Sequence, residues 1–161
     1  MSDAPFRPFD DQLPLDDALF VLREATKGAD DGEIFAERSQ SEALMFDDGR
    51  LKTASHDISE GFGLRAVRGE VAGYAHSTEM SLSSLRRASE TARLAVGDGG
   101  GTLADAPRAT NRHLYSGEAP DSGIPFPVKV ETLSEIDAYA RALDKRVVQV
   151  TASLAAGLQE V

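Results

Sequence analysis

The stretch from Glu33 to Thr78 constrains the possible folds more than any other part of the sequence. It contains short runs in which apolar and polar residues alternate. A period of two is that of a β-strand with one covered face. Asp48-Gly49 and Arg68-Gly69 separate these runs, and both pairs are typical of tight hairpins because Gly readily adopts a positive φ. Strands joined by tight hairpins run antiparallel, since parallel neighbours need a long crossover. The stretch therefore predicts an antiparallel sheet.

Five short segments carry this strand pattern, and the middle ones are close enough to merge. They are residues 33–38, 43–47, 50–56, 58–67 and 71–77. Because the middle segments can merge, we expect four to five strands, and a further β-rich run at residues 148–155 predicts another strand. The sequence stops soon after this run with no turn or cap. Because natural domains seldom leave a strand open in this way, we expect the polypeptide to continue beyond Val161.

Two segments on either side of residues 33–77 have the 3.6-residue period of amphipathic helices. Residues 14–27 begin with Pro14 and two aspartates, which favour a first helical turn, and Gly28 suits a left-handed C-terminal cap. The expected buried stripe of this helix is Leu15, Leu19, Leu22 and Thr26. Residues 81–96 predict a second helix lying on the sheet, with a buried stripe of Leu82, Leu85, Ser89, Ala92 and Val96.

A third helix is expected to begin at Thr132-Leu-Ser-Glu135, which has the sequence of a capping box. Its expected buried stripe is Leu133, Ile136, Ala140, Leu143 and Val147. Residues 102–128 contain several prolines and no period, and predict a long irregular connection. With residues 1–13 as an irregular lead-in, residues 14–161 are expected to form one α+β domain, an antiparallel sheet packed by about three helices.

The charge and the residue types present exclude several classes of function. Asp and Glu total 27 against 17 Lys and Arg, a net charge of -10, so the cationic face that nucleic acid requires is not expected. The absence of Cys excludes disulfides, Cys-ligated zinc and a thiol nucleophile in this sequence. No apolar run approaches the length that crosses a bilayer, and the acidic N-terminus is unlike a secretory signal. We therefore expect a cytoplasmic domain that binds no membrane.

Two glycine-rich segments resemble nucleotide-binding motifs without their structural context. Gly61-Phe-Gly-Leu-Arg-Ala66 has the spacing of a dinucleotide fingerprint, but a predicted hairpin follows where the motif requires a helix. A bulge or a close backbone approach explains its glycines better. Residues 97–101 follow a predicted helix and lack the Lys-Ser/Thr pair of a phosphate-binding loop, so they indicate a flexible helix exit.

Spacing alone assigns no catalytic and no metal-binding residue. His56, His76 and His113 are too far apart to share a helix face, although His56 and His76 would meet if their strands were neighbours. No Gly-x-Ser-x-Gly or Ser-x-x-Lys sequence is present. Arg86-Arg87-Ala88-Ser89 resembles a basic kinase site, but Ser89 falls on a predicted buried stripe where a phosphate would be costly.

Arg65, Tyr74 and His76 form the one candidate polar patch. Arg65 lies on a glycine-flanked strand, and Tyr74 and His76 lie on the strand expected to pair with it. The guanidinium fork of an Arg can hold a carboxylate or a peptide carbonyl. The simpler alternative is an ion pair of Arg65 with Glu60 or Glu70.

Two longer stretches resemble a known family. They are GFGLRAVRGEVAGYA at residues 61–75 and DKRVVQVTASL at residues 144–154, and they are similar to the N-terminal region of the TldD/PmbA family, once called modulators of DNA gyrase, and within it to the TldD branch. The resemblance implies a cytoplasmic zinc metallopeptidase that pairs with a TldE/PmbA-like paralogue and trims unfolded or leader peptides. In TldD proteins a His-Glu-x-x-x-His helix and a later Cys bind the zinc, and the Glu is the general base.

This sequence contains neither the His-Glu motif nor a Cys, so no catalytic or metal residue carries over from the family. The much longer family members would place those residues after Val161. The resemblance thus implies an N-terminal domain that docks against a catalytic domain, with zinc in the full-length protein and none bound by this chain. An exposed strand is a candidate for capturing peptides through main-chain hydrogen bonds, and Arg65, Tyr74 and His76 are candidate peptide contacts.

The alternative is a non-enzymatic interaction module that serves dimerisation or modulates DNA gyrase. The two hypotheses differ in what the gene encodes beyond Val161. A His-Glu-x-x-x-His sequence and a downstream Cys favour the peptidase, whereas their absence favours the interaction module.

Overall fold

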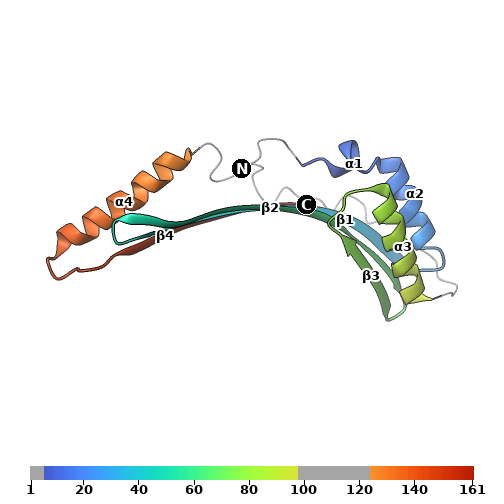
Figure 1. Cartoon of the computed structure of the whole chain (residues 1–161). Coiled ribbons are helices and arrows are strands. Elements are labelled where there is room, and N and C mark those ends of the chain that lie inside the picture. The colour runs from blue at the N-terminus through green and yellow to red at the C-terminus, as the bar shows by residue number, and fades with distance from the viewer. Residues whose placement is uncertain (1–5, 98–123) are drawn as a thin grey trace, which may run out of the picture. The chain divides into compact units, whose positions relative to one another are not determined.

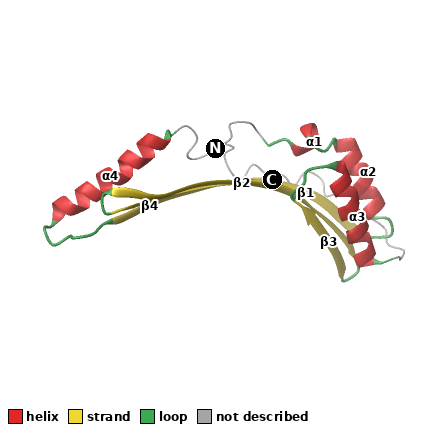
Figure 2. Cartoon of the chain, viewed as in Figure 1, coloured by secondary structure: helices red, strands yellow, loops and turns green. Residues whose placement is uncertain are grey.

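The computed structural model describes residues 6–97 and 124–161, which have an α+β fold (Figure 1). One four-stranded sheet has the strand order β3-β2-β1-β4. Its strands are β1 (Asp31–Asp47), β2 (Arg50–Arg68), β3 (Val71–Ser77) and β4 (Thr151–Glu160). The described helices are α1 (Pro8–Asp11), α2 (Leu15–Ala25), α3 (Leu82–Val96) and α4 (Phe126–Leu143) (Figure 2). The predicted fold class is confirmed, with four helices in the described residues where about three were expected.

Both predicted hairpin turns are present. Asp48 and Gly49, between β1 and β2, have φ angles of 49° and 75°, and Gly69, between β2 and β3, has a φ of 57°. β2 and β3 pair antiparallel from Phe62 opposite Ser77 to Arg68 opposite Val71. The five short segments expected in this region are three strands, because the first two merge into β1 and the next two merge into β2.

β4 begins later and runs further than the predicted residues 148–155. The backbone N–H of Asp48 donates to the carbonyl of Val150 at 3.0 Å, just before β4 begins. At the other end of β4, Arg38 Nη2 lies 2.7 Å from Glu160 Oε2. The two contacts join the end of β1 to the start of β4 and the middle of β1 to the end of β4, so β4 runs antiparallel to β1.

The chain forms two compact units. In the described residues, one unit contains residues 39–58 and 124–159, which we call the α4 unit. The other contains residues 6–38, 59–97 and 160–161, which we call the α2–α3 unit. β1 and β2 contribute residues to both units, and each unit has its own cluster of buried apolar side chains.

The core of the α2–α3 unit confirms one predicted helix stripe and corrects the other. On α3, Leu85, Ala92 and Val96 are buried as expected. On α2, Leu15 is 53% exposed and Leu19 is 39% exposed, so the predicted stripe is wrong at these two positions, whereas Thr26 is buried as expected. The buried face of α2 carries smaller residues, because small side chains let a helix approach its neighbours closely. These residues are Ala18, Val21 and Ala25. Gly28 follows α2 with a φ of 75°, in keeping with a left-handed C-terminal cap.

The predicted start of the last helix is wrong. α4 begins at Phe126, with Pro125 as its N-cap residue and Pro127 in its first turn, where proline loses no helical hydrogen bond. Thr132 is therefore inside the helix, and its hydroxyl donates to the carbonyl of Val128 at 3.0 Å. The capping-box sequence was misleading because a Thr inside a helix can satisfy its hydroxyl on the preceding turn.

The predicted buried stripe of α4 is also largely wrong. Leu133 is buried, but Ile136 is 46% exposed and Leu143 is 68% exposed, while Lys129 and Asp137 are buried. Leu133 packs with β-strand residues in the second apolar cluster, which contains Leu44, Phe46, Leu51, Val130, Ala152 and Leu154. The helix thus turns a partly polar face toward the strands.

Some predicted features lie outside the described residues. They are residues 1–5 of the lead-in, residues 98–101 of the glycine-rich helix exit, residues 102–123 of the irregular connection, and His113. Within the rest of the lead-in, Pro8–Asp11 form the one-turn helix α1. None of the described helices is both long enough and apolar enough to cross a membrane.

Candidate functional site

The predicted patch lies on β2 and β3 in the α2–α3 unit. The strand register places Arg65 opposite Tyr74 and Gly63 opposite His76. The Tyr74 and His76 rings stack with their centroids 5.7 Å apart, and the Phe35 ring of β1 lies 6.4 Å from that of Tyr74. The structure therefore brings Tyr74 and His76 together and adds Phe35, which the sequence did not indicate.

Arg65 is engaged by carboxylates on β1. Its Nε lies 2.8 Å from Glu33 Oε1, and its Nη2 lies 3.8 Å from Asp31 Oδ2. An ion pair is the simpler of the two roles expected for Arg65, but its partners are Glu33 and Asp31 instead of Glu60 or Glu70. Because all three side chains are well exposed, this cluster contributes little to stability.

The glycines of Gly61-Phe-Gly63 are explained by close approach, as the sequence indicated. A Cβ on Gly63 would lie 2.4 Å from the Phe35 ring and 2.8 Å from the Tyr74 hydroxyl. A Cβ on Gly61 would lie 2.6 Å from the carbonyl oxygen of Ser77. The strand then continues into the β2–β3 hairpin, so the helix that a dinucleotide site requires is absent from this position.

A groove with a volume of about 380 Å³ lies between β3 and α3, and we call it the β3 groove. One wall consists of consecutive residues of β3, namely Tyr74, Ala75, His76 and Ser77. The other wall is one face of α3, formed by Ser84, Arg87, Ala88 and Thr91. Consecutive strand residues point to opposite faces of a sheet, so residues that line one groove together must present the outer edge of the strand.

A second concavity of about 400 Å³ shares Tyr74, His76 and Ser77 with the β3 groove. Its other walls include Phe35, Glu37 and Gly61. The candidate site therefore extends from the aromatic residues on the sheet to the end of β3.

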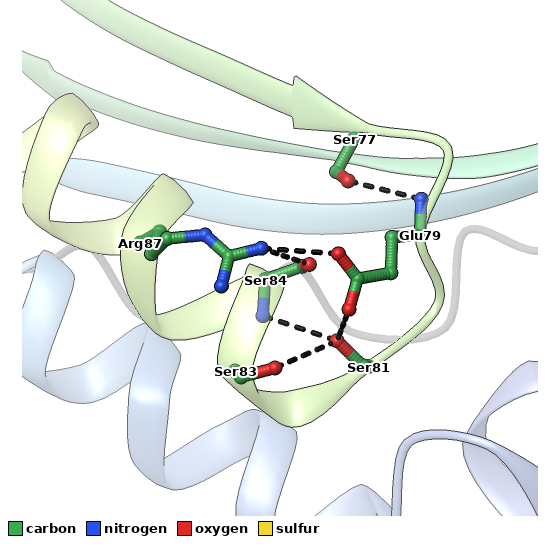
Figure 3. A network of polar contacts seen from close by, with 6 residues as sticks. All are labelled: Ser77, Glu79, Ser81, Ser83, Ser84 and Arg87. Carbon is green, nitrogen blue, oxygen red and sulfur yellow. Dashed lines mark hydrogen bonds and ion pairs between the residues drawn. The ribbon is translucent and has the colours of Figure 1, made fainter.

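A polar network connects the start of α3 to the end of β3 (Figure 3). The hydroxyl of Ser81, the N-cap residue, donates to Glu79 Oε1 at 2.8 Å and accepts from the Ser84 N–H at 3.2 Å. Arg87 Nη2 donates to Glu79 Oε2 at 3.1 Å and to Ser84 Oγ at 2.7 Å. The Glu79 N–H donates to Ser77 Oγ at 3.0 Å, which ties the network to β3.

This network lowers the pKa of Glu79 below its ordinary value, through hydrogen bonds from the Ser84 and Ser81 side chains and the charge of Arg87. A carboxylate with a lowered pKa contributes stability above its unfolded-state pKa and loses it as the pH falls through the folded-state pKa. We expect the Glu79→Gln variant to be slightly less stable at neutral pH and to lose less stability on acidification. The midpoint of thermal unfolding across the range from neutral to acidic pH measures this difference.

Glu90→Gln, on the same helix but outside this network, is the matched control for the Glu79 variant. It should retain the full acid-dependent loss of stability seen for the unmodified chain. An acid response of Glu79→Gln equal to that of the unmodified chain would show that the Glu79 carboxylate is not held by these contacts.

The other sequence candidates do not form a site in the described residues. Ser89 is 8% exposed, and its hydroxyl donates to the Arg86 carbonyl at 2.9 Å. A kinase therefore cannot reach this hydroxyl while the helix is folded. His56 and His76 belong to different units. Across residues 6–97 and 124–161, no three His, Asp or Glu side chains are grouped so that they could hold a metal ion.

The α3 wall of the β3 groove was not found from sequence. Ser84, Arg87 and Thr91 are spaced as one helix face, but this face becomes part of a site only because β3 is the last strand of the sheet. The two hairpins predict the order β1-β2-β3, but they do not predict that β4 pairs with β1 and so leaves β3 at the edge of the sheet. The position of Phe35 beside Tyr74 depends on the same strand order.

Comparison with known proteins places these features in context. Residues 32–96 match the family described as PmbA/TldA metallopeptidase domain 1. The chain is 32% identical over 139 residues to the metalloprotease TldD homolog of Haemophilus influenzae, covering 84% of this chain and 29% of that protein. It is 29% identical over 147 residues to the metalloprotease TldD homolog of Buchnera aphidicola from Acyrthosiphon pisum, covering 90% of this chain and 30% of that protein. The chain thus spans less than a third of the length of these relatives.

Two solved structures share the fold. A putative modulator of DNA gyrase from Bacteroides thetaiotaomicron has a TM-score of 0.61 and 16% identity, and the match covers 94% of this chain and 36% of that one. TldE from Thermococcus kodakarensis has a TM-score of 0.55 and 17% identity, and the match covers 89% of this chain and 35% of that one.

Proposed function

The chain belongs to the PmbA/TldD metallopeptidase family and carries its N-terminal domain, and from this premise we propose that it is the scaffold and substrate-docking domain of a TldD-like zinc metallopeptidase acting on unfolded or leader peptides. The main support is the extent of the match to relatives named metalloprotease TldD homolog, which covers 84% and 90% of this chain but under a third of each relative. The catalytic part would then lie in the remainder of the full-length protein.

The described residues do not fit a zinc site. They contain no group of three His, Asp or Glu side chains placed to bind one ion, and the sequence contains no Cys. Protein zinc sites use three or four such ligands. We propose that the zinc of the full-length protein is bound outside the described residues, and that the role of this domain is to bind and orient the peptide.

The sheet supports peptide docking because it ends in two edge strands, β3 and β4. An extended chain can add to such an edge through main-chain hydrogen bonds. Main-chain recognition selects unfolded segments over folded ones, because folded segments have already paired these groups. It also tolerates many sequences, which suits a peptidase that acts on unfolded chains.

The proposed partner of the full-length protein is a TldE/PmbA-like paralogue, in keeping with the shared fold of TldE from Thermococcus kodakarensis. The proposed location is the cytoplasm. The sequence contains no Cys, so the fold does not depend on disulfides or on the oxidising compartment in which they form.

The second candidate is a non-enzymatic interaction module, supported by the name of the similar protein from Bacteroides thetaiotaomicron, a putative modulator of DNA gyrase. With a net charge of -10, the chain would act on such a target through protein contacts and not through DNA.

Metal analysis and peptide hydrolysis by the full-length protein, alone and with a TldE-like partner, test the proposed function. We expect about one zinc ion per full-length chain, as in other catalytic zinc sites, and hydrolysis of unstructured peptides that a chelator abolishes. The 161-residue chain in the same buffer is the control, and it should retain no zinc and cleave nothing. A full-length protein without zinc and without hydrolysis under either condition would favour the interaction module.

A further inference from the structure

A groove runs along α4 in the α4 unit, and we call it the α4 groove. Its volume is about 960 Å³, more than twice that of the β3 groove. One wall is α4 from Phe126 to Ala138, a length of about 18 Å at the rise of an α-helix. The opposite wall is the β1–β2 hairpin, at Phe46 and residues 49–51. The groove is therefore as long as about three turns of a helix.

The floor of the α4 groove is apolar. Phe46 is 5% exposed, and it belongs with Leu51 and Val130 to the apolar cluster of this unit. Phe126 lines the groove at the start of α4 and is 48% exposed. Covering this floor with another apolar surface would remove the Phe126 ring from water, which is favourable.

The α4 wall has the surface of a helix that packs against a second helix. Val130, Ser134 and Ala138 lie four residues apart, so they form one row along α4. Rows of this spacing interdigitate with the side chains of a neighbouring helix, and small side chains allow a close approach. Of the described helices, only α4 packs on the strands of this unit, whereas α2 and α3 contact each other in the other unit (Figure 1). The α4 groove thus has the length and the surface for one more helix.

Charges on the two rims of the α4 groove specify the flanks of such a helix. Glu131 and Glu135 lie four residues apart on the α4 rim, and both are exposed without an ion pair in the described residues. Like charges at this spacing on a helix repel each other, and a cation beside them relieves the repulsion. Arg50 lies on the opposite rim, also exposed and with no ion pair in the part of the chain that the structure describes. The complementary helix therefore carries Lys or Arg on the flank beside α4 and acidic or neutral residues on the other flank.

We propose that the α4 groove binds an amphipathic helix of a partner protein. Its apolar side chains, spaced three to four residues apart, cover Phe46 and Leu51, and its basic flank pairs with Glu131 and Glu135. The net charge of -10 disfavours a second copy of this chain as the occupant, because two such copies repel each other. The site belongs to the α4 unit, whereas the β3 groove belongs to the α2–α3 unit, so this inference goes beyond the proposed function.

Fluorescence anisotropy of a labelled helical peptide mixed with the 161-residue chain tests this proposal. The peptide has about 16 residues, because shorter helices are marginal in water, and it is built on Ala. It carries Leu every three to four residues, with Lys on one flank and Gln on the other. The matched peptide has Glu in place of each Lys. We expect the Glu peptide to bind about tenfold more weakly than the Lys peptide, because two attractions at the rim become repulsions.

Reversing the charge of the α4 rim should reverse this order. Both rim residues are exposed, so Glu131→Lys combined with Glu135→Lys leaves the core unchanged. We expect this double variant to bind the Glu peptide about tenfold more tightly than the Lys peptide.

Ser134→Trp is designed to fill the α4 groove. Ser134 is exposed on the α4 wall, so the larger side chain enters the groove and not the core. We expect at least about tenfold weaker binding of the Lys peptide, because its apolar side chains no longer reach the floor. Ile136→Trp is the matched control, since Ile136 is 46% exposed on the same helix and does not line the groove. It should bind as the unmodified chain does.

Four results would overturn the assignment. They are no binding of either peptide, equal binding of the two peptides by the unmodified chain, an unchanged order of affinity in the charge-reversed variant, and binding by Ser134→Trp as tight as that by Ile136→Trp. A dimer of the chain that Ser134→Trp dissociates would also overturn it, because the groove would then hold a second copy. A full-length protein without hydrolysis would overturn the proposed function alone, since helix binding is measured without catalysis.

Discussion

Replacing Lys129 with Met is expected to lower the free energy of unfolding by about 3–5 kcal/mol. The Lys129 ammonium pairs with the Glu42 carboxylate in the α4 unit, and the two side chains are only 7% and 12% exposed. Without the ammonium, the Glu42 carboxylate is left nearly buried with no counter-ion, and water has little access to replace it. Urea unfolding at neutral pH, followed by circular dichroism, measures the difference.

A double variant distinguishes the effect of the ion pair on stability from the effect of side-chain packing. Lys129→Met combined with Glu42→Leu should recover most of the loss, because replacing a buried ion pair with apolar side chains is often neutral in stability. Lys145→Met is the surface control and should change stability by about 0.5 kcal/mol or less. If Lys129→Met were as mild as Lys145→Met, the pair would have to be well solvated, contrary to its burial.

The same ion pair explains why α4 was predicted incorrectly. A helical pattern assumes that apolar residues face inward, but Lys129 and Asp137 are buried on α4 while Tyr139 is 68% exposed. Lys129 is buried because Glu42, far away in the sequence, neutralises it, and Asp137 is paired with Arg141 at 3.0 Å. Nothing in the local sequence identifies Glu42 as the partner, so the period of apolar residues could not place this helix face.

Features that depend on neighbouring residues were predicted well. The turns at Asp48-Gly49 and Gly69 follow from local φ preferences, and the buried stripe of α3 follows from a period carried by Leu85, Ala92 and Val96. On α2, two apolar stripes compete, and packing favoured the one with smaller residues. Strong local signals therefore fixed the type and order of most elements, while the choice of buried face needed the packed structure.

The candidate site also combines features that the local sequence predicts with features that depend on the packed structure. Arg65, Tyr74 and His76 were grouped from sequence because their strands were expected to pair, and β2 and β3 do place Arg65 opposite Tyr74. The partners of Arg65 were not predicted, because Glu33 and Asp31 lie on β1, and the break expected between residues 38 and 43 interrupted the register that the Asp48-Gly49 turn sets. The α3 wall of the groove requires both the strand order and the position of the helix. Local sequence patterns therefore predict least well a site that is formed between separate helices and strands.

Gly73→Ala is expected to lower the free energy of unfolding by about 3 kcal/mol, toward the upper end of overpacking effects. The added Cβ would lie 2.2 Å from the Ala92 carbonyl oxygen and 3.0 Å from the Ala95 Cβ. A carbonyl within a helix cannot rotate away, so α3 itself has to move off β3. Thermal and urea unfolding of the 161-residue chain measure the loss.

Gly157→Ala is the matched control, because it also places a methyl group on a strand glycine. Its Cβ would lie 3.8 Å from the Gln40 carbonyl oxygen, an ordinary contact, so the change should be within about 0.5 kcal/mol and of either sign. Equal stability of the two variants would mean that α3 does not rest on β3 at Gly73.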